Sequence, residues 1–425
     1  MNRLKELRSN KNFKRVAENF FSLSILNGLN FVFPLILIPY LTRVLGVDGY
    51  GVYAFSFSIL SYCMLLARYG FEFSATRQIA IVRSDKHKLN KLFYSVLFAR
   101  IGLIGVAFII LNILILLVPK FTTIKEELFY GAGIFVGSAL IPVWFFQGME
   151  NMKFMTLINF LVRLSSTVLI FVWVKSPDQI HVALGFQSVG YIFGGLVSII
   201  LAIKLFKLSF VFPHLKEVWF QLKDGWHLFI STLGMNFYRE SNTIILGLLT
   251  NEMYVGYYAA AEKIIKAVQA ITSPFVNAIY PFFSRKLNDN NSEDKSFKLY
   301  NKVGIYFGAL LLILTVLVLL FSPWGVVHYL GSNYEHSILT IQILSFVVFL
   351  GGLNYYYGII GLVNMKKEKY FTRSVWVAGV ISIVVCVSLS NILFANGAAL
   401  AMVSAELILF VQIMLYQKRF RVLQK

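Results

Sequence analysis

Several charged residues lie inside long apolar stretches of this chain, where an ionised side chain is costly. Arg239 and Glu240 fall in one such stretch, and Glu262, Lys263 and Lys266 fall in the next. A cation at the centre of a membrane span costs at least about 2.5 kcal/mol, so it normally faces a partner or a wet cavity. Glu262 and Lys266 are four residues apart and share a helix face, so they can pair. Adjacent residues such as Arg239 and Glu240 point about 100° apart on a helix and cannot pair directly.

Two interpretations of this charged group are open. The charges are either structural ion pairs that hold two helices together, or part of a cationic cavity for an anionic substrate. Three cations against two carboxylates leave the group net positive, which favours the second interpretation because a purely structural network tends to be balanced. Two further arginines in apolar stretches would add to such a cavity. The predicted substrate-binding residues are Arg239, Lys263, Lys266, Arg163 and Arg100. Arg68, near the end of its stretch, is expected to reach the headgroups instead.

The acidic residues in apolar stretches have a separate set of possible roles. Glu240, Glu262 and Glu406 are candidates for binding a coupling proton or sodium ion, or for structural pairing. The two cysteines, Cys63 and Cys386, and the six scattered histidines show no metal-ligand spacing. No phosphate-binding loop, nucleophile elbow or zinc signature occurs. The sequence therefore predicts no catalytic residue, no metal, no cofactor and no enzymatic activity.

The composition indicates that the helices carrying these residues lie in lipid rather than in water. Hydrophobic residues make up 58% of the 425 residues and charged residues 14%, against about 45–50% and about 25% in soluble domains. The net charge of +19 could indicate nucleic acid, but most basic residues lie in short loops between apolar stretches, which argues against it. The longest hydrophilic run, 285–302, is too short to fold alone. The pattern predicts an all-α integral membrane protein.

Twelve apolar stretches are long enough to cross a bilayer as helices. The expected spans are residues 20–42, 50–70, 92–118, 128–148, 155–174, 183–203, 227–249, 255–282, 303–322, 337–363, 371–394 and 397–416. Loops that share a side with the N-terminus hold 29 Lys and Arg residues, and the opposite loops hold 4. The positive-inside rule therefore predicts that both termini are cytoplasmic.

The two halves of the chain resemble each other. GVYA at 51–54 is followed half a chain later by GYYA at 256–259, each just after an odd-numbered span, and the loop-charge pattern repeats with six spans per half. Six plus six related helices are typical of transporters with a substrate route between the halves. We expect two pseudo-symmetric six-helix bundles, 1–207 and 226–425, around a central cavity, joined by a cytoplasmic linker at 208–225.

Four stretches carry a resemblance to a known family. They read NFFSLSILNGLNFVFPLILIPYLTRVLG at 19–46, YGFEFSATRQIA at 69–80, PVWFFQGMENMKF at 142–154 and GYYAAAEKIIKAVQAITSPFVNAIYPFFSR at 256–285. Together with the six-plus-six layout, they resemble the O-antigen repeat-unit flippases of polysaccharide biosynthesis, in the multidrug/oligosaccharidyl-lipid/polysaccharide exporter superfamily.

That resemblance implies a function and a location. Such proteins move undecaprenyl-pyrophosphate-linked oligosaccharide from the inner to the outer leaflet of the bacterial cytoplasmic membrane, by alternating access through a cationic cavity. The family's Glu-Lys pair matches Glu262 and Lys263, with Lys266 in the next basic position, and its Ala-Thr-Arg matches Ala75, Thr76 and Arg77. The implied partners are the lipid-linked oligosaccharide, membrane lipid, H⁺ or Na⁺ as coupling ion, and polysaccharide polymerase machinery.

Three other functions stay open at this point. A drug/cation antiporter of the same superfamily would favour buried carboxylates over cations. A flippase for another lipid-linked glycan, such as a peptidoglycan or teichoic-acid precursor, would look much the same in sequence. A polymerase or ligase would place its chemistry in a large outer loop, and the longest one here, about 323–336, has no basic residue.

Overall fold

The computed structural model describes residues 11–287 and 293–423, and the elements within them are helical, with no strand. The chain divides into two compact units. The first comprises residues up to Phe33 together with Ser56–Leu233, and the second comprises Pro34–Phe55 and the residues from Gly234 onward. Two long helices, α2 (Lys11–Arg68) and α11 (Leu215–Leu249), each contribute residues to both units. The sequence-based boundaries at 207 and 226 stay a prediction.

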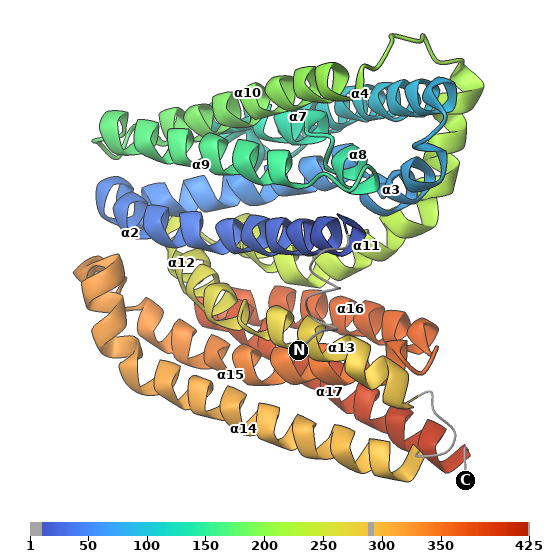
Figure 1. The fold of residues 1–425 in the computed structure, drawn as a ribbon. Coiled ribbons are helices and arrows are strands. Elements are labelled where there is room, and N and C mark those ends of the chain that lie inside the picture. Colours follow the sequence, from blue (N-terminus) through green and yellow to red (C-terminus); the bar gives the residue numbers. More distant parts are fainter. Residues whose placement is uncertain (1–10, 288–292, 424–425) are drawn as a thin grey trace. The chain divides into compact units, whose positions relative to one another are not determined.

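The remaining helices belong to one unit each (Figure 1). In the first unit they are α3 (Phe71–Val82), α4 (Lys86–Leu117), α5 (Pro119–Thr123), α6 (Lys125–Gly131), α7 (Gly133–Leu140), α8 (Val143–Gly148), α9 (Lys153–Trp173) and α10 (Ile180–Phe206). In the second they are α12 (Glu252–Gln269), α13 (Thr272–Leu287), α14 (Glu293–Gly325), α15 (Ser337–Tyr355), α16 (Glu368–Leu393) and α17 (Ala395–Leu423), with π-helical turns at Val326–Leu330 and Tyr356–Val363 and a 3₁₀ turn at Ser332–Tyr334.

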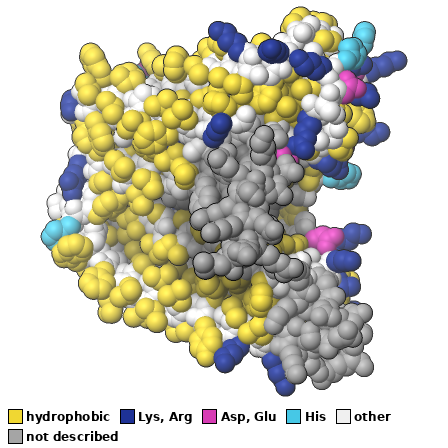
Figure 2. All heavy atoms as spheres, viewed as in Figure 1, with side chains coloured by type: hydrophobic (Ala, Val, Ile, Leu, Met, Phe, Trp, Pro, Cys, Tyr) yellow, Lys and Arg dark blue, Asp and Glu magenta, His cyan; other side chains and the backbone are white. Residues whose placement is uncertain are grey.

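Nine segments of the described residues are long and apolar enough to cross a membrane. Hydrophobic side chains cover most of the face shown in Figure 2. Large apolar residues such as Ile109 and Leu116 of α4 and Leu320 of α14 are 61%, 83% and 70% exposed, as a lipid-facing surface requires. The prediction of an all-α membrane fold is confirmed. The first of the nine segments, Val32–Val82, contains the expected span 50–70 and the second half of the expected span 20–42, and the charged helices α11 to α13 are not among the nine.

Three of the expected spans differ in detail. The loop expected between 42 and 50 is a sharp kink at Gly46, where α2 breaks into two helices that follow each other directly; Gly46 adopts φ 70°, a value that favours glycine. The expected span 128–148 is interrupted before α8, because Pro142 has no N–H to continue the helix. The expected span 255–282 is two helices, α12 and α13, separated at Ala270 and Ile271. Apolarity predicted these spans, whereas their interruptions depend on single residues.

The core of the first unit is aromatic. Phe93 of α4 and Trp144, Phe145 and Phe146 of α8 are each at most 1% exposed, and the Phe93 and Phe145 ring centroids lie 4.9 Å apart. These α8 residues belong to the PVWFFQG stretch. In the second unit, α15 packs against α14 and α17 (Figure 1), and the Tyr300 and Tyr356 rings stack with centroids 5.4 Å apart.

The two repeated glycines of GVYA and GYYA lie at one helix contact of the second unit. A Cβ on Gly51 of α2 would lie 1.9 Å from the Glu252 carbonyl oxygen, and a Cβ on Gly256 of α12 would lie 2.3 Å from the Val47 carbonyl oxygen. Both obstacles are backbone atoms, which cannot move aside as a flexible side chain can. The absence of a side chain at Gly51 and Gly256 therefore allows α2 and α12 to approach each other closely.

We expect Gly51→Ala to lower the free energy of unfolding by about 2 kcal/mol, because the added methyl group overpacks a backbone contact. Gly102→Ala is the matched control, since a Cβ at Gly102 of α4 meets nothing within 4 Å and alanine favours a helix. Thermal unfolding of the purified protein in detergent measures both. Equal unfolding temperatures for Gly51→Ala and wild type would contradict the prediction.

Candidate functional site

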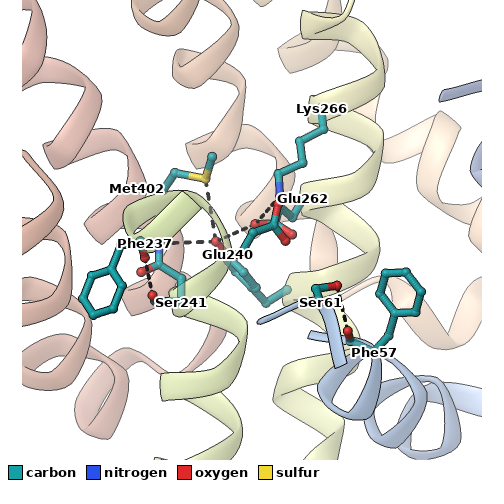
Figure 3. A network of polar contacts seen from close by, with 10 residues as sticks. Phe57, Ser61, Phe237, Glu240, Ser241, Glu262, Lys266 and Met402 are labelled. Atoms are coloured by element: carbon teal, nitrogen blue, oxygen red, sulfur yellow. Dashed lines mark hydrogen bonds and ion pairs between the residues drawn. The ribbon is translucent and has the colours of Figure 1, made fainter. Parts of the chain in front are cut away.

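A half-buried lysine lies between two carboxylates in the second unit. The Lys266 Nζ of α12 is 2.9 Å from the Glu240 Oε1 of α11 and 3.2 Å from the Glu262 Oε1 of α12 (Figure 3). The three side chains are 19%, 29% and 3% exposed. Glu262 and Lys266 form the i, i+4 pair that helical spacing predicts. Glu240 joins them from a different helix, so this charged cluster links α11 to α12.

The helix that carries the cluster has a defined start. The side chain of Asn251 accepts a hydrogen bond from the Tyr254 N–H and caps α12. Three consecutive alanines, 259–261, then give strong helix propensity and allow neighbouring helices to approach. This cap and the regular turns that follow place the side chains of Glu262 and Lys266 one above the other.

A chain of neutral polar groups extends the cluster into the unit. The Tyr258 hydroxyl is 3.4 Å from the Glu262 Oε1, and the Asn242 side-chain amide is 3.5 Å from that hydroxyl. The Ser382 hydroxyl of α16 donates to the Asn242 Oδ1 at 3.3 Å. The Tyr258 hydroxyl also lies 3.7 Å from the Met402 sulfur of α17. Four helices therefore contribute to one polar network, α11, α12, α16 and α17.

The sequence analysis did not single out Tyr258, Asn242 or Ser382. Asn242 and Ser382 are buried, with 0% exposure, and a buried amide in a lipid-soluble bundle needs partners within the protein. An asparagine next to a charged pair, inside an apolar stretch, was the available signal. A periodic analysis of charges alone does not detect it.

The two other predicted cations of this region lie on the same helices. Arg239 is on α11 next to Glu240, and its side chain lies outside the described residues. Lys263 is half-buried on α12 and has electrostatic contacts of its own. By sequence, three cations and two carboxylates share this region of α11 and α12, and the structure brings Lys266 and both carboxylates together.

Arg100 belongs to the first unit and is 1% exposed. Its Nη1 donates to the carbonyl oxygens of Ala139 and Ile141, at 3.0 Å each. The guanidinium carbon lies 5.8 and 5.9 Å from the ring centroids of Phe71 and Trp144, within cation–π range. Arg100 therefore supplies donors to the chain where Pro142 interrupts the helix.

Arg163 is half-buried on α9, also in the first unit, with contacts of its own. The predicted substrate-binding arginines Arg100 and Arg163 thus belong to the first unit and Lys263 and Lys266 to the second. A shared role for all five cations stays a prediction.

Glu406 of α17 has an amide partner. It is 1% exposed, and the Asn354 Nδ2 donates to its Oε2 at 2.7 Å and to its backbone oxygen at 2.8 Å. Gln269 lies close by, because a Cβ on Gly351 would meet both the Gln269 Nε2 at 2.1 Å and the Glu406 Oε1 at 3.3 Å. This second polar group connects α15 and α17 with α12, as a structural pair or a coupling site would.

The Ala-Thr-Arg stretch of α3 connects elements of the first unit. The Thr76 hydroxyl lies 3.1 Å from the Trp144 carbonyl oxygen, and Arg77 donates to Asp224 of α11 at 3.0 Å. Arg68 forms an ion pair with Glu72, four residues on. Within residues 11–287 and 293–423, no three His, Cys, Asp or Glu residues cluster as metal ligands.

Comparison with known sequences identifies relatives of the chain. Residues 16–287 match the family described as "Polysaccharide biosynthesis protein". A protein of Escherichia coli strain K12 named "Putative O-antigen transporter" is 30% identical over 402 residues, covering 93% of this chain and 95% of that protein. A Shigella dysenteriae protein of the same name is 28% identical over 322 residues, covering 76% of this chain and 80% of that protein.

Comparison with solved structures shows the fold. A structure described as lipid II flippase MurJ in an inward closed conformation has a TM-score of 0.76 at 14% identity, with 93% of this chain and 87% of that chain covered. An inward-facing multidrug resistance MATE family transporter of the MOP superfamily has a TM-score of 0.65 at 15% identity, covering 96% and 99%. The chain has the fold of these membrane transporters.

Proposed function

Because this chain belongs to the polysaccharide biosynthesis protein family of membrane transporters, we propose that it translocates an undecaprenyl-pyrophosphate-linked oligosaccharide. The substrate is an O-antigen or other surface-polysaccharide repeat unit, and it moves from the inner to the outer leaflet of the bacterial cytoplasmic membrane. Transport is by alternating access, with both termini in the cytoplasm. The named relatives are transporters, which supports a role without catalysis of a covalent reaction.

The observation that carries this proposal is the cluster of half-buried Lys266 and Glu240 with buried Glu262. A pyrophosphate with attached sugars cannot cross hydrocarbon unaided, and a cation at bilayer depth replaces part of its hydration. Lys266 has the required charge, its ammonium lies 2.9 and 3.2 Å from two carboxylates, and Arg239 and Lys263 are next to these carboxylates in sequence. The polyprenyl tail stays in lipid while the polar head crosses.

The carboxylates give the cluster a way to release its substrate. Glu240 and Glu262 occupy Lys266 in this conformation, so a pyrophosphate competes with them for the same ammonium. Protonation of one carboxylate, or its binding of Na⁺, weakens its hold on Lys266 and favours the substrate. Deprotonation reverses the exchange. A site that binds moderately by such competition lets the substrate leave on the other side.

Multidrug transport is a second function found in proteins of the same fold. The MATE family transporter shares the fold, and a drug/cation antiporter would use Glu240, Glu262 and Glu406 to bind its cationic substrate. Within the apolar stretches 227–249 and 255–282, three cations stand against two carboxylates, which favours an anionic substrate. A flippase for a different lipid-linked glycan would use the same cluster with another sugar.

Depletion of the protein in its native host tests the proposal. We expect polyprenyl-pyrophosphate carrying a finished repeat unit to accumulate in the cytoplasmic leaflet while surface polymer is lost. Mass spectrometry of extracted membrane lipids measures the accumulation and identifies the sugar. Re-expression of the wild-type protein is the control and restores both. No accumulation, together with new sensitivity to cationic dyes, would overturn the proposal and favour the antiporter.

A further inference from the structure

A pocket in the first unit lies away from the charged cluster in sequence and has its own chemistry. It has a volume of about 460 Å³ and is formed by α3, the start of α4 and the start of α11, all within the first unit. Pockets of about 300–1,000 Å³ are of the size that binds small molecules and headgroups. The segments that form it, 71–91 and 204–224, are among the basic loops expected to be cytoplasmic.

One part of the lining is basic. Lys88, Lys91 and Lys216 all line the pocket, and Glu217 is the acidic residue among its lining side chains. Lys91 forms an ion pair with Glu217, which ties α4 to α11. The hydrogen bond from Lys91 holds the pKa of Glu217 below its ordinary value, so Glu217 is ionised at neutral pH. The lining side chains therefore carry three positive charges against one negative charge, and Lys88 pairs with Asp85, outside the lining, at 3.2 Å.

The other part of the lining is apolar and open to the surroundings. Ile81 of α3 and Phe220 of α11 line the pocket and are 75% and 57% exposed. Leu215 and Trp219, on the same turns of α11, are 83% and 67% exposed. Exposed tryptophan and phenylalanine beside lysine are typical of the membrane–water interface. The pocket is thus placed at headgroup depth rather than in bulk water.

A buried amide gives the pocket a third feature. Gln221 is 5% exposed, and its Nε2 donates to the Gln78 Oε1 at 3.2 Å, while the Gln78 Nε2 donates to Asp224 at 2.8 Å. This series of hydrogen bonds fixes the Gln78 and Gln221 side chains, both of which line the pocket. The Gln221 Oε1 accepts no hydrogen bond from the described residues, although a buried acceptor normally has a donor.

We propose that this pocket binds the phosphate headgroup of an anionic glycerophospholipid of the cytoplasmic leaflet. Lys216 contacts the phosphate, Lys88 and Lys91 exchange their carboxylate partners Asp85 and Glu217 for it, and the apolar wall contacts the proximal acyl chain. Basic pockets on the cytoplasmic side of membrane proteins bind such headgroups. The lipid is retained rather than transported, so this inference is independent of the proposed function.

Native mass spectrometry of the full-length protein with added phosphatidylglycerol or phosphatidylcholine tests the inference. We expect the wild type to prefer phosphatidylglycerol, and Lys88→Gln/Lys91→Gln/Lys216→Gln to bind it at least about tenfold more weakly, since each lysine near a headgroup contributes measurably. The matched control, Lys298→Gln/Lys369→Gln/Lys418→Gln, removes three exposed lysines elsewhere and keeps the preference. Equal preference in all three proteins would overturn the inference.

A substitution that is expected to strengthen lipid binding separates effects on binding from effects on folding. Glu217→Gln removes the carboxylate that pairs with Lys91, so we expect it to bind phosphatidylglycerol severalfold more tightly than the wild type. A pair with only a structural role would give weaker or unchanged binding, which would overturn the inference. Displacement of bound phosphatidylglycerol by an equimolar polyprenyl phosphate would likewise overturn it, because the pocket would then be a substrate site.

Discussion

Lys266→Met is expected to lower the free energy of unfolding by about 3–5 kcal/mol, because it leaves Glu240 and Glu262 without the cation that they share. We also expect transport to fall by at least about tenfold to a hundredfold, since a charged hydrogen bond to the substrate is lost. Thermal unfolding in detergent measures the first effect. Flipping of a fluorescent polyprenyl-pyrophosphate glycan in proteoliposomes measures the second, at matched amounts of folded protein.

A neutral variant separates the two effects. Glu240→Gln/Glu262→Gln/Lys266→Met removes all three charges, and replacement of a whole buried ion group by neutral residues is often close to neutral for stability. We therefore expect this triple variant to regain most of the stability that Lys266→Met loses, but none of the transport. Recovery of transport together with stability would show that the cluster is only a structural contact between α11 and α12.

Arg100→Leu is expected to destabilise the first unit by about 3 kcal/mol. Arg100 donates to the Ala139 and Ile141 carbonyl oxygens at 3.0 Å where Pro142 interrupts the helix; the Ile141 oxygen also accepts from the Val143 N–H at 3.0 Å, so the substitution leaves the Ala139 oxygen without its donor. A buried carbonyl that loses its donor costs about 1–3 kcal/mol. Arg100→Lys is expected to lose less, because an ammonium can still donate to one carbonyl. Thermal unfolding of the purified variants gives the comparison.

Arg77→Leu is the matched control for this experiment. Arg77 is also an arginine of the first unit with an oxygen partner, Asp224, but its side chain is 65% exposed. An exposed ion pair contributes at most about 1 kcal/mol. If Arg100→Leu were no more destabilising than Arg77→Leu, the assignment of Arg100 to the helix interruption would be wrong.

Much of the fold follows from local properties of the sequence. Apolar runs predict α4, α9, α10 and α16 to within a few residues, because a lipid-facing helix must be apolar over its whole length. The kink at Gly46 is less predictable. An interruption between 42 and 50 was expected, but the glycines there do not show which one adopts the positive φ.

The grouping of 34–55 with the second unit could not be predicted from the order of the segments. It depends on contacts between residues far apart in the chain. The Thr42 hydroxyl, for example, lies 3.1 Å from the Leu330 carbonyl oxygen, and the Tyr334 hydroxyl donates to the Gly46 carbonyl at 3.3 Å. The repeated glycines at 51 and 256 were the available signal. Their meaning, a close approach of two backbones, is visible only in three dimensions.

The candidate site, like the fold, was predictable from the sequence only in part. The pairing of Glu262 with Lys266 follows from a spacing of four residues on one helix. The inclusion of Glu240 requires that α11 and α12 lie side by side, which no local pattern contains. The partners of Arg100 are backbone carbonyls, and every residue has one, so the sequence carries no mark of which carbonyls lose their helical donors.

The division of α2 between two units also has a consequence for biosynthesis. About 180 residues separate Phe55 from Gly234, and ribosomes add about 5–20 residues per second. The segment Pro34–Phe55 therefore waits on the order of ten seconds or more in the membrane before the helices that it packs against have been made. During that time its glycine-lined face is open to other helices or to an insertion chaperone. Correct assembly thus requires that this segment stays available until those helices are made.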